Sequence, residues 1–263
     1  MALFPRTLTR YEMADAGSSR ELVMMGSVPV KPANYDQLLA SDGWQNDLRA
    51  LNLALVDSLT AVGEAPSIGG SPFYRHMQHG SIVTGKFTTR NDTKRRRLFD
   101  LARLGTHWFE IGVNGGHGLL LVKSANPDLK CVGIDICQTV GAGNPRADIY
   151  CPTAMRWLEN QFPGDMRFMM GSSSELLPAF VRDNPGTRID ILRIDGARRL
   201  YFSDFMAMRP LLHKGSYIIF DDPGWPTCRE TVMKLMEMGE LQPDPQFSPL
   251  DKLFTQDPVM RLA

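Results

Sequence analysis

A glycine-rich turn between two apolar segments is the feature that most limits how this chain can fold. Residues 108–121 read Trp-Phe-Glu-Ile-Gly-Val-Asn-Gly-Gly-His-Gly-Leu-Leu-Leu, with four glycines in seven residues. Because glycine has no Cβ, such a turn lets the backbone approach a ligand closely. The pattern predicts a strand that ends near Glu110, a tight turn, and then a helix.

A second apolar segment, residues 130–136, also ends on an acid, Asp135. A glycine turn followed roughly 20 residues later by an acid is how an open α/β sheet holds a nucleoside, with the carboxylate on the ribose hydroxyls. A dinucleotide-binding turn requires glycines at 114 and 117, where this chain has Asn114 and His117. The sequence therefore favours a nucleoside cofactor without a pyrophosphate and disfavours NAD.

The turn resembles the first motif of class I S-adenosylmethionine-dependent methyltransferases, E/D-x-G-x-x-x-G, here Glu110, Gly112 and Gly116, with Asn114 in place of the usual middle glycine. The resemblance implies an α/β fold with a doubly wound, mostly parallel, seven-stranded Rossmann-like sheet. It implies that the loop wraps the methionine part of the cofactor and that Asp135 binds both ribose hydroxyls. The cofactor contacts that it implies are Glu110, Gly112, Asn114, Gly115, Gly116, Asp135, Ile136, Gly171, Ser172, Ser173 and Asp195.

Composition restricts the classes of partner. The 263 residues are 43% hydrophobic and 22% charged, with a formal net charge of +0, as in a globular protein with a real core. A neutral chain has no overall field for polyanions, so we expect neither nucleic acid nor a membrane as partner. No apolar run approaches the ~20 residues of a membrane span, and no signal peptide is recognisable. The four cysteines lack C-x-x-C spacing, which favours reduced thiols and a cytoplasmic location over a zinc site or disulfides.

Strand and helix patterns alternate from residue 108 onward, which predicts a parallel sheet covered on both faces. The strands are expected at 108–111, 130–136, 166–170, 188–195 and 216–222, with two short ones in the tail at 253–255 and 259–262. The helices are expected at 93–102, 152–162, 201–212 and 227–239 and from residue 175, with an irregular insertion at 139–145. The basic run at 94–97 is expected to be a solvated helix face.

The first third of the chain has a different pattern. We expect residues 1–92 to form an N-terminal arm and helical extension, and residues 93–263 to form the cofactor-binding catalytic domain. An apolar stripe from Tyr35 to about Val62, broken at 41–43, predicts one or two helices that pack, form a homodimer contact, or act as a lid over the acceptor. Residues 65–72 are typical of a linker. His76 and His79 are interpreted as ordinary surface or interface histidines, or as one histidine entering the active site.

Four of the five main strands end on acids, at the edge where open α/β sheets bind ligands. Clustered carboxylates repel each other unless a cation or hydrogen-bond donors compensate, and three of them suit Mg²⁺ or another hard divalent ion. Ile194-Asp-Gly196 and Phe220-Asp-Asp-Pro223 resemble the macrocin-type sugar and natural-product O-methyltransferases. The resemblance implies that Asp195, Asp221 and Asp222 bind a divalent metal that holds the acceptor oxygens. The alternative is that Asp195 and Asp221 cap loops or bind the cofactor amine.

The function that the resemblance implies is metal-assisted methyl transfer from S-adenosylmethionine to a hydroxyl of a small molecule, such as a sugar or natural product. Relatives often carry a base shortly after I-D-G, where this chain has Ala197-Arg-Arg199, and arginine cannot act as a general base. The catalytic candidates are Asp195, His117 and Arg198. The alternatives are transfer to nitrogen or carbon, another reaction of the same cofactor such as cyclisation or elimination, an NAD-dependent oxidoreductase, and a methyltransferase-like subunit without activity.

Overall fold

The computed structural model describes residues 31–74, 81–138 and 146–263. Most of the predicted N-terminal arm, His76 and His79, and the insertion predicted at 139–145 lie outside the described residues. In the described part, every helix falls short of the length and apolar character that a membrane crossing requires.

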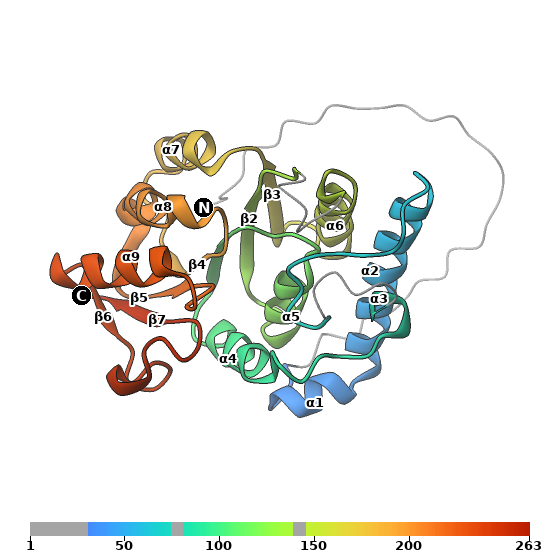
Figure 1. The fold of residues 1–263 in the computed structure, drawn as a ribbon, viewed down its shortest axis with the longest axis horizontal. Coiled ribbons are helices and arrows are strands. Elements are labelled where there is room, and N and C mark those ends of the chain that lie inside the picture. Colours follow the sequence, from blue (N-terminus) through green and yellow to red (C-terminus); the bar gives the residue numbers. More distant parts are fainter. Residues whose placement is uncertain (1–30, 75–80, 139–145) are drawn as a thin grey trace.

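A seven-stranded sheet forms the centre of the molecule, in the order β3-β2-β1-β4-β5-β7-β6 (Figure 1). Strands β1 to β5 are parallel, and β7 runs antiparallel to both β5 and β6. The order reverses between β1 and β4, which is the switch point where open α/β sheets bind ligands. The predicted doubly wound, mostly parallel sheet is therefore confirmed. The strands are β1 His107–Ile111, β2 Lys130–Asp135, β3 Met166–Met170, β4 Ile189–Ile194, β5 Leu212–Phe220, β6 Leu241–Pro243 and β7 Val259–Leu262.

Helices cover both faces of the sheet, and two groups of buried side chains fill the spaces between the layers. One face carries α4 Asp92–Ala102, α5 His117–Ala125 and α6 Ala147–Gln161, with α1 Tyr35–Ala40, α2 Asp42–Thr60 and the short α3 Ser81–Thr84 packed outside them. The other face carries α7 Ser173–Asp183, α8 Tyr201–Met208 and α9 Pro226–Glu237. In β1, successive side chains point to opposite faces, so Trp108 joins the first core and Phe109 the second.

The helical extension is built from local signals that the sequence carries. The Asn34 side chain accepts a hydrogen bond from Gln37 N–H at the start of α1, and Ser41 does the same for Trp44 N–H at the start of α2. Ser41 is therefore the break predicted at 41–43. Buried residues of α1 and α2 belong to the same core as those of α4, α5 and α6. The division at 92/93 thus separates two parts of the chain but not two cores.

Two local predictions were wrong. The tail segment 253–255 is not a strand, because a 3₁₀ turn at Leu250–Lys252 and further turns occupy this region, and β6 at 241–243 pairs with β7 instead. The basic run of α4 is not simply a solvated face. Lys94 and Arg95 point into the protein, and the Arg95 side chain is 4% exposed. A helix with residues buried at successive positions has partners on more than one side.

Arg95 joins the extension to the sheet. Its guanidinium donates to the Tyr35 hydroxyl at 2.7 Å and to the carbonyls of Pro72 and Thr88, both at 2.9 Å. Its partners thus lie in α1 and in the segment that leads from α2 to α4. A buried cation held by several acceptors is costly to remove, because each acceptor then loses a charged donor.

Replacing Arg95 by alanine is expected to lower the free energy of unfolding by about 3 kcal/mol, because two buried carbonyls and a hydroxyl lose their donor. Urea unfolding followed by circular dichroism measures this change. Arg96→Ala is the matched control, since Arg96 lies on the same helix but is 44% exposed, with surface partners Asp36 and Asp92. Equal losses in the two variants would contradict a special role for Arg95.

Candidate active site

The glycine loop lies between the ends of β1 and β4. Gly112 has φ +93°, and a Cβ at this position would clash with the backbone carbonyl of Asp195. The Gly112 N–H donates to Ile134 O at 2.8 Å, and the Asp195 N–H donates to Ile111 O at 2.8 Å. Only glycine allows the chain to pass this point, so the loop and Asp195 are held side by side.

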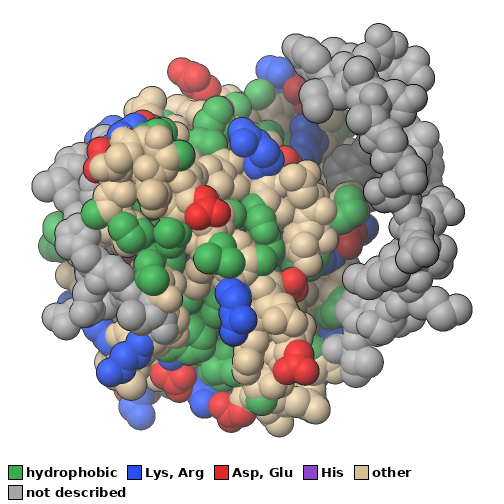
Figure 2. Space-filling model, turned by 90° about the vertical axis from the view of Figure 1, so that its right-hand side faces the viewer, with side chains coloured by type: hydrophobic (Ala, Val, Ile, Leu, Met, Phe, Trp, Pro, Cys, Tyr) green, Lys and Arg blue, Asp and Glu red, His purple; other side chains and the backbone are tan. Residues whose placement is uncertain are grey.

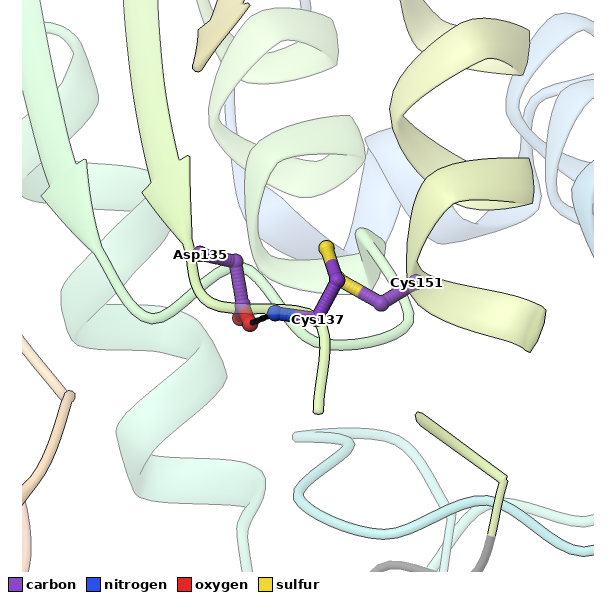
Figure 3. Close-up of side chains that lie close together, drawn as sticks. All are labelled: Asp135, Cys137 and Cys151. Atoms are coloured by element: carbon purple, nitrogen blue, oxygen red, sulfur yellow. Dashed lines mark hydrogen bonds between the residues drawn. The ribbon is translucent and has the colours of Figure 1, made fainter. Parts of the chain in front are cut away.

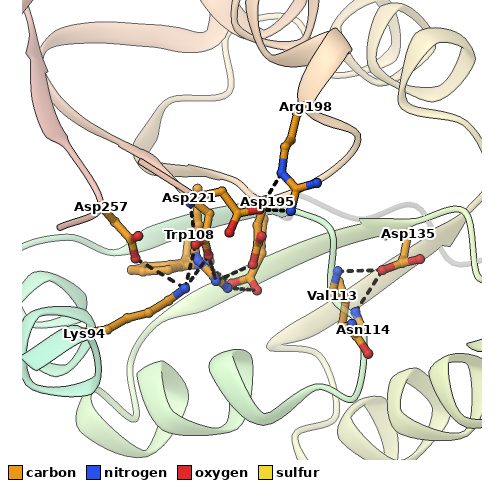
Figure 4. A network of polar contacts seen from close by, with 12 residues as sticks. Lys94, Trp108, Val113, Asn114, Asp135, Asp195, Arg198, Asp221 and Asp257 are labelled. Atoms are coloured by element: carbon orange, nitrogen blue, oxygen red, sulfur yellow. Dashed lines mark hydrogen bonds and ion pairs between the residues drawn. The ribbon is translucent and has the colours of Figure 1, made fainter. Parts of the chain in front are cut away.

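Asp135 fixes the loop from the neighbouring strand. Its Oδ2 accepts hydrogen bonds from the backbone N–H groups of Val113 and Asn114, both at 2.8 Å (Figure 4). Its Oδ1 accepts from the N–H of Cys137 at 2.7 Å. A carboxylate has about four acceptor sites, so three backbone bonds leave capacity for a ligand hydroxyl. The sequence predicted a ribose contact here; the structure adds that this acid orders the loop.

The ends of β2 and β3 complete this half of the site. Ile136 is 41% exposed and Met170 is 64% exposed, which places apolar surface beside the loop. Gly171 N–H donates to Asp135 O at 2.9 Å, and its φ is +152°. Ser172 is the N-cap of α7 and Ser173 its first residue. The predicted cofactor contacts at 136 and 171–173 lie with Asn114 and Gly115 along one edge of the sheet, and Met170 lies beside them without having been predicted.

Two thiols lie directly beside Asp135. The Sγ atoms of Cys137 and Cys151 are 2.8 Å apart, and with a carboxylate oxygen of Asp135 they form a close group (Figure 3). All four cysteines are free. The Cys151 pKa is raised by its hydrogen bond with Cys137 and by burial, so the sulfur remains a neutral thiol. Because a thiolate and not a neutral thiol binds metal, we interpret this group as packing beneath the loop.

Glu110 lies behind the loop, away from the surface. It is 1% exposed, and it accepts from Trp108 Nε1 at 3.0 Å and from the Arg193 guanidinium at 2.6 Å. Burial raises its pKa, while Arg193 opposes that rise. Glu110 is thus a buried partner of Arg193, and its predicted contact with the cofactor stays a prediction. It faces Arg193 in the register of β1 and β4.

Arg193 gathers the acids at the ends of three adjacent strands. Besides Glu110 on β1, it donates to Asp195 after β4 and to Asp221 after β5, the latter at 2.5 Å (Figure 4). Lys94 reaches the same place from α4, with Nζ at 2.7 and 2.5 Å from the two Asp221 oxygens and 3.3 Å from Asp257. The site is thus a network of four carboxylates and two cations.

The charges in this network divide Asp195 from Asp221. The Asp221 side chain is 5% exposed, and although its burial opposes ionisation, Lys94 and Arg193 hold its pKa well below the usual value. Asp195 is 24% exposed, and burial together with the Asp221 charge raises its pKa well above the usual value. Two neighbouring carboxylates with opposite shifts are a common arrangement for acid–base work. Asp195 is the one that a ligand can reach.

Asp222 does not join the other two acids. Its backbone has φ +60°, and its carboxylate pairs with Arg198, Nε to Oδ2 at 2.8 Å. The Arg198 guanidinium also lies 4.1 Å from the centre of the Trp225 ring, and Trp225 is 52% exposed. Arg198 is therefore at the rim of the site, tied to Asp222 and stacked on an aromatic face.

His117 lies in the core and not in the reaction site. It is 1% exposed, its Nε2 is 2.8 Å from Asn52 Oδ1, and its ring packs edge-on against Tyr74 at 5.2 Å. Burial lowers its pKa to about 3, so the ring is neutral at physiological pH. A proton carrier needs a pKa near the working pH and access to the substrate. The prediction of His117 as a catalytic candidate is therefore corrected.

The predicted divalent ion does not fit the acids as the structure arranges them. A hard ion needs several carboxylate oxygens that converge and are free to bind it. Asp221 is already bound by Lys94 and Arg193, and Asp222 turns toward Arg198. Among the described residues, the metal-ligating side chains whose atoms converge are instead those of the Asp135, Cys137 and Cys151 group.

Sequence reasoning missed Lys94, Arg193 and Asp257. Arg193 did carry a signal, because an arginine between isoleucines and leucines in a central parallel strand must be buried and so requires an acid. Lys94 carried none, since it belongs to a run of four basic residues. Asp257 lies in a tail whose path the sequence did not specify.

Comparisons with known proteins agree with this geometry. Residues 109–223 match the family model described as a methyltransferase domain. This chain carries a methyltransferase domain. The match begins in β1, includes the glycine loop, Asp135 and Asp195, and ends just after Asp222. The resemblance to class I methyltransferases is therefore confirmed, and so is the expectation of an enzyme.

Solved structures show the same fold over most of the chain. An O-methyltransferase from Bacillus cereus in complex with S-adenosylhomocysteine is 14% identical, with a TM-score of 0.54, covering 87% of this chain and 94% of its own. The apo structure of CalS11, a TDP-rhamnose 3′-O-methyltransferase of calicheamicin biosynthesis, is 18% identical, with a TM-score of 0.50, covering 84% and 95%. At such identities the likeness is one of fold. No curated protein matches the methyltransferase chain.

Gly112→Ala is expected to abolish binding of S-adenosylhomocysteine, because the new Cβ would push the glycine loop away from the Asp195 carbonyl. Gly164→Ala is the matched control, since Gly164 also has a positive φ, +80°, but nothing within 4 Å of its Cβ position. Both variants bear the left-handed strain of about 1–2 kcal/mol, so the comparison isolates the clash. Isothermal titration measures affinity, and equal binding by the two variants would contradict the role of Gly112.

Proposed function

We propose that this methyltransferase moves the methyl group of S-adenosylmethionine to a hydroxyl oxygen of a small-molecule acceptor, with Asp195 as the general base. The observation that carries the proposal is the position of Asp195. It is the most exposed acid of the network, and it lies against the glycine loop that Asp135 orders. The named function of the O-methyltransferases that share the fold supports transfer to oxygen.

The residues present suit the cofactor. A loop with glycine where a Cβ would clash, an acid that keeps acceptor capacity, and exposed apolar side chains at 136 and 170 provide places for the methionine, ribose and adenine parts respectively. When bound, the cofactor supplies a methyl group on a sulfonium, and the acceptor oxygen must approach this group in line with the bond that breaks. Alignment of two reactants is worth several kcal/mol of the barrier.

Asp195 completes the reaction by taking the proton. As the acceptor oxygen forms its bond to the methyl carbon, the carbon–sulfur bond breaks and the hydroxyl proton passes to the Asp195 carboxylate. Arg193 holds one oxygen of that carboxylate, which fixes its direction. Arg198 follows Asp195 by three residues and stacks on the exposed Trp225 ring, so a cation and an aromatic face are offered to the acceptor. A divalent ion on the three acids is not part of this proposal.

The role of the extension remains a prediction. Beside α2 the surface is hollowed by about 450 Å³, with mainly apolar walls that include Trp44, Leu48, Val56 and Phe87. Figure 2 shows the side of the molecule on which α2 lies, where apolar side chains reach the surface in several patches. Such a surface suits either of the predicted roles, a lid over the acceptor or a homodimer contact.

S-adenosylhomocysteine at 100 times its dissociation constant is expected to stabilise the protein by about 2.7 kcal/mol, measured as a thermal shift, and NAD is expected to produce no shift. Asp135→Asn should weaken the response, because one carboxylate oxygen becomes an NH₂ group, and the backbone N–H groups that donated to that oxygen lose their acceptor. Asp183→Asn, an exposed acid on α7, is the control. A shift with NAD alone would overturn the cofactor assignment.

Asp195→Asn is expected to lower kcat about 10²- to 10⁴-fold, the range for loss of a general base, while affinity for S-adenosylhomocysteine stays near the wild-type value. The base works when deprotonated, so the wild-type rate should rise with pH through the Asp195 pKa. Because that pKa is raised, this rise should occur at a higher pH than for an ordinary aspartate. A pH–rate profile measures this rise of the rate with pH. If the same rise persists in Asp195→Asn, Asp195 is not its source.

A further inference from the structure

The positive charge in the acid network comes from two side chains, Lys94 and Arg193. Asp221 receives Lys94 Nζ on both oxygens, at 2.7 and 2.5 Å, and the Arg193 guanidinium at 2.5 Å. It also accepts the Asp222 N–H at 2.8 Å. A carboxylate has about four acceptor sites, so these four bonds use the capacity of Asp221. An entering metal ion must therefore displace a protein donor.

Both cations are permanent at physiological pH. Arginine cannot be deprotonated in a protein, and Asp221 and Asp257 raise the Lys94 pKa above its ordinary value in spite of burial. A divalent ion bound to Asp221 would lie close to two fixed positive charges, and like charges in a poorly solvated site repel strongly. The electrostatics of the site thus oppose a metal ion even where carboxylates are plentiful.

The third predicted ligand is committed elsewhere. Asp222 pairs with Arg198, so the charge of this acid is already compensated by that arginine. Lys94 and Asp257, which complete the network around Asp221, come from α4 and from the tail, and both lie outside the segment that matches the methyltransferase model. The network around Asp221 therefore combines Arg193 of the matched segment with residues that lie beyond it.

We propose that Lys94, together with Arg193, takes the place of a divalent ion at Asp221, so that the methyl transfer proposed above proceeds without metal. Lys94 is a positioning residue: its ammonium group holds Asp221, Asp221 holds Arg193, and Arg193 directs the Asp195 carboxylate. The lysine thereby neutralises the end of β5 and keeps the base in place.

Removal of the lysine charge should convert the site. The four acids Glu110, Asp195, Asp221 and Asp257 carry a formal charge of −4, and Lys94 and Arg193 reduce it to −2. Lys94→Met keeps much of the length of the side chain but leaves −3 and removes one donor from each oxygen of Asp221. Such a site is closer to the carboxylate set that a hard divalent ion prefers.

The test compares metal dependence in the wild type and in Lys94→Met, after chelator treatment and dialysis. In the wild type, Mg²⁺ or Mn²⁺ is expected to change neither the melting temperature nor the methyl-transfer rate. Lys94→Met is expected to lose about 10- to 100-fold in rate, the usual effect of removing a residue that orients a functional side chain, and to regain stability and part of the rate with Mg²⁺. Lys94→Arg should keep most of the rate without metal.

Lys214→Met is the matched control, because Lys214 is exposed near the start of β5, at the other end of that strand. It should behave as the wild type does. If Lys94→Met does not fold, Lys94→Arg carries the test, because it keeps the positive charge beside Asp221: it must stay active after chelation, and a rate that depends on Mg²⁺ would overturn the proposal. The proposal is overturned if the wild type binds Mg²⁺ saturably and loses its rate on chelation, or if Lys94→Met and Lys214→Met respond alike. The effect of metal on the melting temperature can be measured without a methyl acceptor, so it tests this proposal by itself. Failure of the proposed function would appear instead as a melting temperature that does not change with S-adenosylhomocysteine.

Discussion

One guanidinium buried in a central strand organises the reactive end of this protein. Arg193 lies in β4 and binds acids that belong to β1, β4 and β5, so a single group ties together the ends of three adjacent strands. Without it, Glu110 would be an uncompensated charge in a poorly solvated place, which is among the most costly arrangements in a protein, and Asp221 would keep only Lys94. The direction of the Asp195 carboxylate depends on this neutralisation, because Arg193 donates to it.

The two halves of the site rest on different kinds of interaction. On the β2 side, Asp135 holds the glycine loop through neutral backbone donors, so this half depends on shape and on hydrogen bonds. On the β5 side, Asp221 is held by two full charges. The halves meet where Gly112 passes the Asp195 carbonyl. In a ligand that spans the switch point, the polar sugar part would therefore face hydrogen bonds and shape on the β2 side. The reacting part would face charged groups on the β5 side.

The sequence predicted features that short-range rules determine and missed those that depend on distant partners. The sheet, the loop and Asp135 follow from strand pattern, glycine spacing and strand ends, all of which are local. The burial of Glu110 against Arg193 was not predicted, because a strand end does not show which way its side chain is covered. Lys94 was taken for a solvated residue because its partners, Asp221 and Asp257, are more than a hundred residues away. The segment 253–255 was taken for a strand because its apolar pair serves a turn equally well.

In chimeras that exchange the extension between related enzymes, the choice of crossover point is constrained by the contacts of one side chain on α4. Arg95 follows the formal boundary at 92/93, yet its hydrogen bonds run back to Tyr35, Pro72 and Thr88. A crossover placed at that boundary would join a foreign extension to an arginine with no acceptors, whereas one placed in the turn before β1 would carry Arg95 along with its partners. The same crossover would also transfer Lys94, so donor choice would set the charge of the reaction site.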